Sequence, residues 1–268
     1  MSLLEVEHLS KTFTRRRKLF GRQGPAAPAV DDVSFTVEEG ECLAVVGESG
    51  AGKSTLGRLV IRLIEPDEGA VRLAGMDIRS LNPRELRTAR EHMQMVFQDP
   101  YSSLDPRMTI RACVAEPLLA HTPMSRTERD RRAAELIDTV GLSSRYLDRY
   151  PVELSGGQLQ RVSIARAIAL KPKLIVCDEP VTALDVSVRA QIINLLQDLR
   201  SEFNLTYLFV SHDLALVEII ADRVLVMRGG RVVETAPAAS IFRDPQDAYT
   251  RELISATPNP IPPRRGQN

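Results

Sequence analysis

The sequence predicts an α/β protein with a parallel sheet at its core, antiparallel strands beside that core and an inserted all-helical segment. Three observations indicate this class. Short apolar runs alternate with segments of helical period, two segments alternate apolar and polar residues, and residues from about 100 to 165 show helix signals without a convincing strand. Continuous apolar runs are typical of strands buried on both faces, as in parallel sheets whose crossovers are helices.

The parallel core is predicted from three apolar runs, at 42–46, 174–177 and 207–210. Between the second and third runs, apolar residues recur at helical spacing, which implies a right-handed crossover. A similar stripe follows the first run and predicts a helix that the sequence EPDEG then ends. The apolar residues of this first helix are Leu56, Leu59, Val60, Leu63 and Ile64.

Other segments complete the predicted organisation. The alternating segments 33–37 and 71–73 predict antiparallel strands. Ser125 and Glu128 form a capping-box pattern at the start of a helix that Gly141 ends. We therefore expect one domain over residues 1–256, with the helical subdomain at about 100–165 inserted in it. The proline-rich tail 257–268 is expected to be flexible, and the basic segment 15–29 to be a solvated loop.

Composition narrows the possible partners. Lysine and arginine number 35, as do aspartate and glutamate, so no global basic field favours nucleic acid. No apolar run approaches the ~20 residues that span a bilayer, and the N-terminus lacks a secretory signal, so any membrane association is expected to need a partner. The three cysteines form no C-x-x-C pair, which excludes the spacing of a zinc ribbon and favours a reducing compartment.

Residues 47–55 match the phosphate-loop pattern G-x-x-x-x-G-K-[ST], between a predicted strand and a predicted helix. Backbone N–H groups and a helix N-terminus favour phosphate there, Lys53 adds a positive charge, and the Ser54 hydroxyl can ligate Mg²⁺. The alternative is a glycine-rich turn that matches the pattern by chance. The predicted nucleotide-phosphate-binding residues of this loop are Gly47, Glu48, Ser49, Gly50, Ala51, Gly52, Lys53, Ser54 and Thr55.

Two carboxylates, Asp178 and Glu179, follow the apolar run 174–177. Neighbouring residues at a strand end point to opposite sides, so Asp178 can reach a metal while Glu179 faces an attacking water. A carboxylate base contributes typically ~10²–10⁴-fold to such a reaction. The alternative is a solvated turn, which the phosphate loop upstream makes the weaker interpretation.

The sequence LSGGQ at 154–158, together with these motifs, makes the chain resemble the nucleotide-binding subunits of ABC transporters over about residues 3–256. This resemblance implies a P-loop NTPase fold of the ABC type, with a RecA-like mixed sheet, an antiparallel β subdomain and an inserted helical subdomain. It implies an ATPase that binds ATP and Mg²⁺. Its partner would be a second ATPase subunit, identical or different, arranged head to tail around two ATP molecules.

In that family the LSGGQ motif faces the ATP of the opposite subunit, which carries over to Ser155, Gly156, Gly157 and Gln158. These residues open a helix, and one chain cannot easily aim two helix ends at one γ-phosphate. Asp185 matches the D-loop residue that contacts the opposite subunit. The structural alternatives are a plain helix cap for LSGGQ and a helix N-cap for Asp185.

Three further positions take roles from the resemblance. Gln98 matches the Q-loop residue, expected to contact Mg²⁺ and water and to link the nucleotide to the membrane partner; Mg²⁺ would thus be held by Ser54, Gln98 and Asp178. His212 matches the switch histidine that holds the γ-phosphate and positions Glu179. Phe13 lies where an aromatic side chain stacks on adenine. The alternatives are a surface-loop glutamine, a structural histidine and a core phenylalanine.

Three stretches, 98–109, 149–154 and 177–187, are similar to oligopeptide and dipeptide importers, in particular to the second of their two ATPase subunits. The resemblance implies peptide import driven by ATP-dependent dimer closure and reopening on hydrolysis. The implied partners are two membrane-embedded permease subunits and, indirectly, an extracytoplasmic solute-binding protein, which places the chain at the cytoplasmic face of the inner membrane. These importers usually carry a cysteine-bearing extension, and no cysteine follows Cys177 here, so no cluster or metal role is carried over.

Two other classes of cassette ATPase remain as alternatives. Those that act on DNA or the ribosome usually contain long coiled coils or tandem cassettes, and the balanced charge also argues against nucleic acid. Exporter cassettes are often fused to a membrane domain. One compact cassette without a membrane-spanning run favours the importer subunit.

Overall fold

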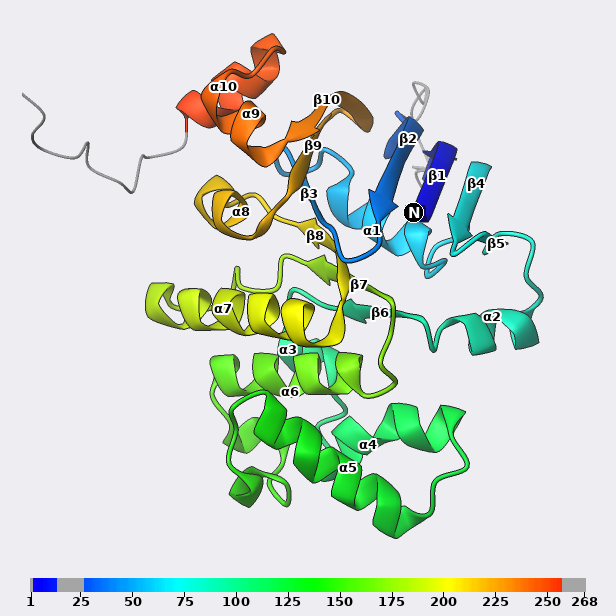
Figure 1. Ribbon diagram of the computed structural model, residues 1–268, viewed down its shortest axis with the longest axis vertical. Helices are drawn as coiled ribbons and strands as arrows, with labels where there is room; N and C mark the ends of the chain where they lie inside the picture. The colour runs from blue at the N-terminus through cyan, green and yellow to red at the C-terminus, as the bar shows by residue number, and fades with distance from the viewer. Residues whose placement is uncertain (1, 14–26, 257–268) are drawn as a thin grey trace, which may run out of the picture.

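The computed structural model describes residues 2–13 and 27–256, and its main sheet has six strands (Figure 1). Their spatial order is β10-β9-β3-β8-β7-β6, and every pair is parallel except β9 with β10. The strands are β3 (Cys42–Val46), β6 (Met93–Val96), β7 (Leu174–Asp178), β8 (Thr206–Val210), β9 (Arg223–Arg228) and β10 (Arg231–Pro237). The predicted α/β class with a mixed sheet is confirmed, and β3, β7 and β8 contain the three predicted runs.

A second, antiparallel sheet of four strands lies beside the first, in the order β2-β1-β4-β5. Its strands are β1 (Ser2–Lys11), β2 (Val30–Glu38), β4 (Glu68–Leu73) and β5 (Met76–Asp77). β2 and β4 confirm the two predicted antiparallel segments. β1 was not predicted, because register shifts and a positive φ of 50° at His8 interrupt the alternation of apolar and polar residues along the strand.

Alternate residues of the parallel strands pack into two different apolar layers. Along β3, Leu43 and Val45 enter the layer between the sheets, which α1 (Lys53–Val60) fills with Leu56 and Leu59. Cys42 and Ala44 face the other layer, which is covered by helices. α1 ends four residues before the end of the predicted stripe, since Arg62 adopts a φ of 51° and donates to the carbonyls of Ile78 and Leu81; the longer helix was therefore wrong.

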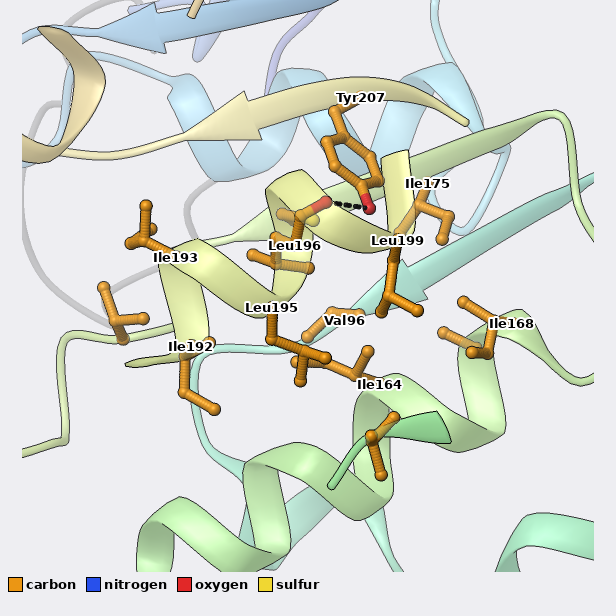
Figure 2. Packing of buried hydrophobic residues seen from close by; sticks show 14 of the residues in the cluster. Val96, Ile164, Ile168, Ile175, Ile192, Ile193, Leu195, Leu196, Leu199 and Tyr207 are labelled. Carbon is orange, nitrogen blue, oxygen red and sulfur yellow. Dashed lines mark hydrogen bonds between the residues drawn. The ribbon is translucent and has the colours of Figure 1, made fainter. Parts of the chain in front are cut away.

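The helical layer is formed mainly by α6 (Gly156–Ile168), α7 (Val186–Phe203) and α8 (Leu214–Ile220). In Figure 2, apolar side chains of α7 lie between the sheet and α6, where Leu199 is near Ile168 and the Tyr207 hydroxyl donates to the carbonyl of Leu196. α7 thus packs against both the sheet and the helical segment.

The helices at the bottom of Figure 1, below α7, belong to the segment between β6 and β7, where the described residues contain no strand. They are α3 (Pro100–Ser103), α4 (Ile110–His121), α5 (Arg126–Thr139), α6 and two short 3₁₀ turns, Ser144–Tyr146 and Pro151–Glu153. α5 begins with the predicted capping box of Ser125 and Glu128, and Gly141 follows its end with a φ of 71°. Side-chain capping at one end and a left-handed glycine at the other fix its length.

The remaining helices are α2 (Pro83–Ala89), α9 (Ala238–Arg243) and α10 (Ala248–Ser255). None of the helices in the described ranges combines the length and the apolar character that a membrane crossing requires. Residues 14–26, which hold most of the predicted basic loop, and the predicted tail 257–268 lie outside the described residues.

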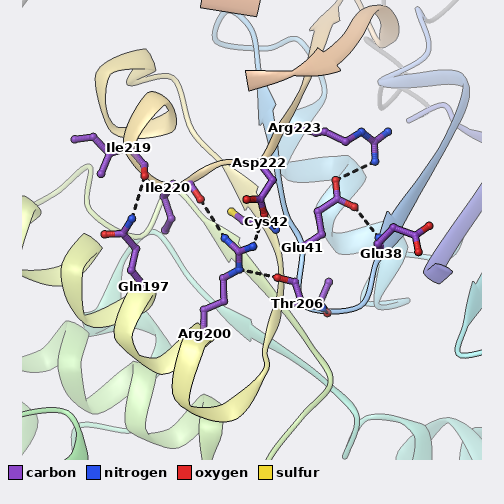
Figure 3. Close-up of polar contacts among 11 residues, drawn as sticks. Glu38, Glu41, Cys42, Gln197, Arg200, Thr206, Ile219, Ile220, Asp222 and Arg223 are labelled. Carbon is purple, nitrogen blue, oxygen red and sulfur yellow. Dashed lines mark hydrogen bonds and ion pairs between the residues drawn. The ribbon is translucent and has the colours of Figure 1, made fainter. Parts of the chain in front are cut away.

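A polar network joins the amino ends of three parallel strands (Figure 3). Arg200, near the end of α7, pairs with Asp222 and donates to the carbonyl of Gly40 at 2.7 Å. Asp222 also accepts from the Cys42 backbone N–H at 2.8 Å. Glu41, only 8% exposed, accepts from Arg223 at 2.9 Å and from the backbone of Glu38. The N–H of Gly40 donates to the Thr206 hydroxyl of β8 at 2.9 Å, so the network joins β3, β8 and β9 at the end of the sheet opposite the candidate site.

Candidate active site

The loops that follow β3, β6, β7 and β8 meet at the carboxyl edge of the sheet around a cavity of about 480 Å³. Ligands of open α/β sheets bind at this edge. The cavity brings together nine predicted residues and adds Ala29 and Thr182, which the predicted set lacks. Its lining is Ala29, Ser49, Gly50, Gly52, Lys53, Ser54, Thr55, Gln98, Glu179, Thr182 and His212.

The phosphate loop needs two of its glycines for steric reasons. Gly47 and Gly52 have φ values of 146° and 100°, and a Cβ added to them would lie 2.2 Å from the Met227 carbonyl oxygen and 2.1 Å from that of Ala29. Gly52 is the N-cap of α1 and supplies no side-chain cap, so the first N–H groups of α1 remain free to bind an anion. The loop thereby presents a helix N-terminus to the cavity.

Lys53 is held within the loop that it belongs to. Its side chain is 5% exposed, and its Nζ donates to the carbonyls of Gly47 and Glu48, both at 2.8 Å. Burial lowers the pKa of Lys53, and the carboxylates of Glu179 and Asp178 oppose this shift. An ammonium group has three donors, so one remains for a phosphate oxygen without breaking either of these bonds.

Glu179 carries the densest set of polar contacts at the cavity. Its Oε2 accepts from Gln98 Nε2 and from the Thr182 hydroxyl, both at 3.1 Å, and lies 3.2 Å from His212 Nδ1. Within the described ranges the other oxygen, Oε1, has no such partner. Glu179 also has a φ of 47°, a left-handed conformation unusual for a residue with a side chain, at the point where β7 turns into the loop. Three loops therefore fix one carboxylate.

Asp178 points to a different side of the chain, as predicted for neighbouring residues at a strand end. It is 1% exposed, its Oδ2 lies 3.4 Å from Arg58 Nη2, and its Oδ1 is buried without a hydrogen-bond partner among the described residues. A buried carboxylate oxygen without a donor suits a hard cation, which prefers oxygen ligands. The Ser54 hydroxyl and the Gln98 amide at the cavity supply the further oxygen atoms that such a cation needs, so the residues present fit Mg²⁺.

The LSGGQ residues lie away from this cavity. Ser155 is the N-cap of α6, and it exchanges hydrogen bonds with Gln158 in a capping box, so the predicted helix begins at these residues. A Cβ on Gly157 would lie 2.5 Å from Val188 Cγ1, which explains this glycine by the close approach of α7. No residue of 155–158 lines the cavity of its own chain.

Two other predicted residues are exposed. Asp185 occupies the N-cap position of α7 but makes no side-chain capping bond. Phe13 is 47% exposed, which excludes the core alternative, and Lys11 Nζ lies 5.8 Å from its ring centroid. The carbonyl of Lys11 accepts from the N–H of Ala29, which lines the cavity, so the strand that precedes Phe13 runs beside the site. Like Phe13, the predicted residues Gly47, Glu48 and Ala51 are not part of the cavity lining.

Arg189 is a further residue of the site that the motifs do not reveal. Its guanidinium donates to the carbonyls of Leu184 at 2.7 Å and Thr182 at 3.3 Å, and lies 3.7 Å from the carboxylate of Asp213. It therefore joins the loop of Asp185 to the loop of His212. An arginine on an amphipathic helix gives no sequence signal for this role, because the contacts exist only after these two loops have come together.

Comparisons with known proteins identify the family of the chain. The family model described as "ABC transporter" matches residues 30–182. The chain is 52% identical to the probable peptide ABC transporter ATP-binding protein y4tS of Sinorhizobium fredii, over 98% of this chain and 74% of that protein. It is 48% identical to the oligopeptide transport ATP-binding protein AppF of Bacillus subtilis, over 96% and 78%.

A solved structure has a similar fold. It is the dimeric structure of a post-hydrolysis state of the ATP-binding cassette MJ0796 bound to ADP and Pi. The TM-score is 0.78 at 31% sequence identity, and the match covers 88% of this chain and 98% of that chain.

Proposed function

Since this chain belongs to the ABC transporter family and is an ATPase of that family, we propose that it hydrolyses ATP to drive peptide import through a membrane-embedded permease. The observation that carries the catalytic part is the meeting of Gln98, Thr182 and His212 on Glu179 beside the phosphate loop. The import part is supported by the similarity to ATP-binding proteins named for peptide transport.

The chemistry follows from the polarity of these groups. ATP binds with its phosphates against the N-terminus of α1 and the free donor of Lys53. Glu179 accepts a proton from a water molecule as the water oxygen bonds to the γ-phosphorus and the bond to the ADP oxygen breaks. Gln98 and Thr182 orient the carboxylate, and His212 holds the γ-phosphate. Phe13 stacks on the adenine.

Mg²⁺ would be held by Asp178, Ser54 and Gln98. When bound, it supplies positive charge that offsets the charge of the phosphate oxygens. Asp178 also lies 3.4 Å from the guanidinium of Arg58, on α1. The side-chain amide of Gln98 donates to Glu179 at 3.1 Å, so a metal held by its oxygen would be connected through this residue to Glu179 and to the segment that leads into α3.

A second ATPase subunit completes the site in this proposal. Ser155, Gly156, Gly157 and Gln158 face the ATP of the partner, and Asp185 contacts the partner beside them. Their position outside the cavity of their own chain and the dimeric form of MJ0796 support this arrangement. ATP closes the dimer and hydrolysis reopens it. The partner is a second copy or a different ATPase subunit.

Ser155→Arg tests the shared site. Arginine at Ser155 blocks the surface that would meet the partner's ATP, so ATP turnover should fall by at least ~10²-fold while ATP affinity of the monomer stays unchanged. Ser144→Arg is the matched control, because it adds the same charge at another exposed serine of the helical segment. Equal loss of binding and turnover in Ser155→Arg would contradict a site shared between subunits.

The membrane partners in this proposal are two permease subunits, supplied with solute by an extracytoplasmic binding protein, and the chain lies against them on the cytoplasmic face of the inner membrane. A test is to reconstitute the chain in vesicles with the permease subunits that co-purify with it and to measure uptake of a labelled tripeptide. ATP-dependent uptake that Glu179→Gln abolishes is the expected result. Uptake of a non-peptide solute alone would refute peptide import and leave the ATPase assignment intact.

A further inference from the structure

The last part of the described chain forms a module that touches the phosphate loop from behind. It consists of β9, β10, α9 and α10, at the top left of Figure 1, and it lies outside residues 30–182, which the family model matches. Two contacts join it to the loop. Gly230 donates its backbone N–H to the carbonyl of Ala51 at 3.0 Å, and Glu48 donates its backbone N–H to the Tyr249 hydroxyl at 3.1 Å.

The second contact is unusual because a side chain 201 positions away in the sequence accepts from the phosphate loop. Tyr249 is 4% exposed, so its hydroxyl oxygen has little access to water as an alternative partner. The guanidinium of Arg228 lies 4.7 Å from its ring centroid, which holds the ring by a cation–π contact. The hydroxyl is therefore fixed in place before any nucleotide binds.

The peptide that Tyr249 holds also controls Lys53. The N–H of the Gly47–Glu48 peptide group donates to Tyr249, and the carbonyl of the same peptide group, that of Gly47, accepts from Lys53 Nζ at 2.8 Å. Tyr249, this peptide group and Lys53 thus form one continuous chain of contacts from α10 to the phosphate-binding ammonium. A rotation of this peptide group would change the direction in which Lys53 points.

The start of α10 is itself anchored to the sheet. The Glu234 carboxylate on β10 accepts from the backbone N–H groups of Gln246 at 2.8 Å and Asp247 at 3.1 Å. Asp247 then caps α10 by accepting from the N–H of Tyr249 at 2.8 Å. Burial raises the pKa of Glu234, but the Thr250 side chain and these two backbone N–H groups together bring it below its ordinary value, so the anchor is ionised at neutral pH. Glu234 therefore fixes the position of Tyr249 relative to the phosphate loop.

We propose that Tyr249 is a positioning residue for ATP binding, through which the C-terminal helix α10 sets the conformation of the phosphate loop. This inference deepens the proposed function and rests on ATP binding at that loop. It acts on ground-state affinity and leaves the chemical step to Glu179. It also makes α10 a route by which a partner of the C-terminal segment changes the affinity for ATP.

The test is Tyr249→Phe, which keeps the ring and its contact with Arg228 and removes only the acceptor. The dissociation constant for Mg–ATP, measured by calorimetry, should rise by about 3- to 10-fold, the range that one neutral hydrogen bond corresponds to. Turnover at saturating ATP should stay within about 2-fold of the wild type. Amide exchange of the loop peptide that contains Glu48 should become faster.

Tyr207→Phe is the matched control, since it also removes a buried tyrosine hydroxyl, which donates to the Leu196 carbonyl in the core. It should lower stability and leave the ATP affinity unchanged. Glu234→Gln is a second variant, which weakens the anchor of α10 and should raise the dissociation constant by about 2-fold in the same direction.

An unchanged ATP affinity in both Tyr249→Phe and Glu234→Gln would overturn the inference, as would an equal loss in Tyr207→Phe. If Tyr249→Phe does not fold, Glu234→Gln alone decides. Failure of the wild-type chain to bind Mg–ATP would refute the proposed function instead, so the two failures are distinguishable.

Discussion

The two ends of the six-stranded sheet are built in opposite ways. At the amino end, Arg200 pairs with Asp222 and Glu41 pairs with Arg223, and these side chains also bind the backbone groups of Glu38, Gly40 and Cys42. At the carboxyl end, Asp178 keeps one buried oxygen unpaired among the described residues. Glu179 has a left-handed backbone there, and Lys53 is buried with a lowered pKa.

The difference shows where stability and function are located. Charges that are fully paired stabilise the strands and have nothing left for a ligand. Charges that lack partners cost folding free energy, and ATP and a cation can offset that cost on binding. We therefore expect substitutions at the amino end to change stability, and those at the carboxyl end to change binding and turnover.

The largest expected effect is that of Lys53→Ala on nucleotide binding. The substitution removes the charged donor at the phosphates, and charge-assisted hydrogen bonds contribute about 1.5–3 kcal/mol each. The dissociation constant for ATP, measured by calorimetry, should rise by at least ~10²-fold. Unchanged binding would contradict the phosphate-loop assignment.

Asp178→Asn should separate the effect on stability from the effect on ATP turnover most clearly. Turnover should fall by at least ~10²-fold, because the unpaired oxygen that suits Mg²⁺ is lost. Stability should stay equal or rise by about 1 kcal/mol, since a buried charge is removed. Urea unfolding and a phosphate-release assay on the same preparation measure both. A loss of stability above about 1 kcal/mol would mean that the carboxylate is structural.

Arg200→Ala is the reciprocal change at the amino end. It removes the donors to Gly40 and Asp222, so unfolding free energy should fall by about 2 kcal/mol, with turnover at saturating ATP unchanged. Arg126→Ala, at an exposed arginine of α5, is the control and should stay within about 0.5 kcal/mol of the wild type. Loss of turnover in folded Arg200→Ala would contradict the claim that the amino end of the sheet contributes to stability alone.

The smallest effect concerns pH. Because burial lowers the pKa of Lys53 in the folded state, protonated Lys53 disfavours folding at neutral pH, and this cost disappears as pH rises from the lowered pKa toward the ordinary value of 10.5. The unfolding free energy of the wild type minus that of Lys53→Met should therefore increase over that interval, as read from urea titrations. A difference that decreases with rising pH would reverse the assigned direction.

Much of this organisation follows from local sequence. The apolar runs of β3, β7 and β8 are continuous because both faces are buried, and the capping boxes at Ser125 and Ser155 need only residues three positions apart. The phosphate loop and the acidic pair are recognisable for the same reason, since each motif occupies a few consecutive residues.

Other features depend on contacts that no short segment contains. Register shifts interrupt the alternating pattern of β1. α1 ends early because Arg62 donates to the carbonyls of Ile78 and Leu81, which lie on a later loop. Arg189 and Tyr249 acquire their roles from distant groups, since Arg189 lies 3.7 Å from the carboxylate of Asp213 and Tyr249 accepts from a residue 201 positions away. Sequence patterns predict helices, strands and motifs, whereas these long-range side-chain contacts exist only in the folded chain.

The most direct test of the account is ATP turnover by Glu179→Gln, measured together with ATP binding. Glutamine keeps the size of the side chain and accepts from Gln98 and Thr182, but it cannot take a proton from water. The account predicts a turnover at least ~10²-fold below that of the wild type, with ATP still bound and a closed dimer accumulating. Turnover within about 10-fold of the wild type would show that Glu179 is not the base.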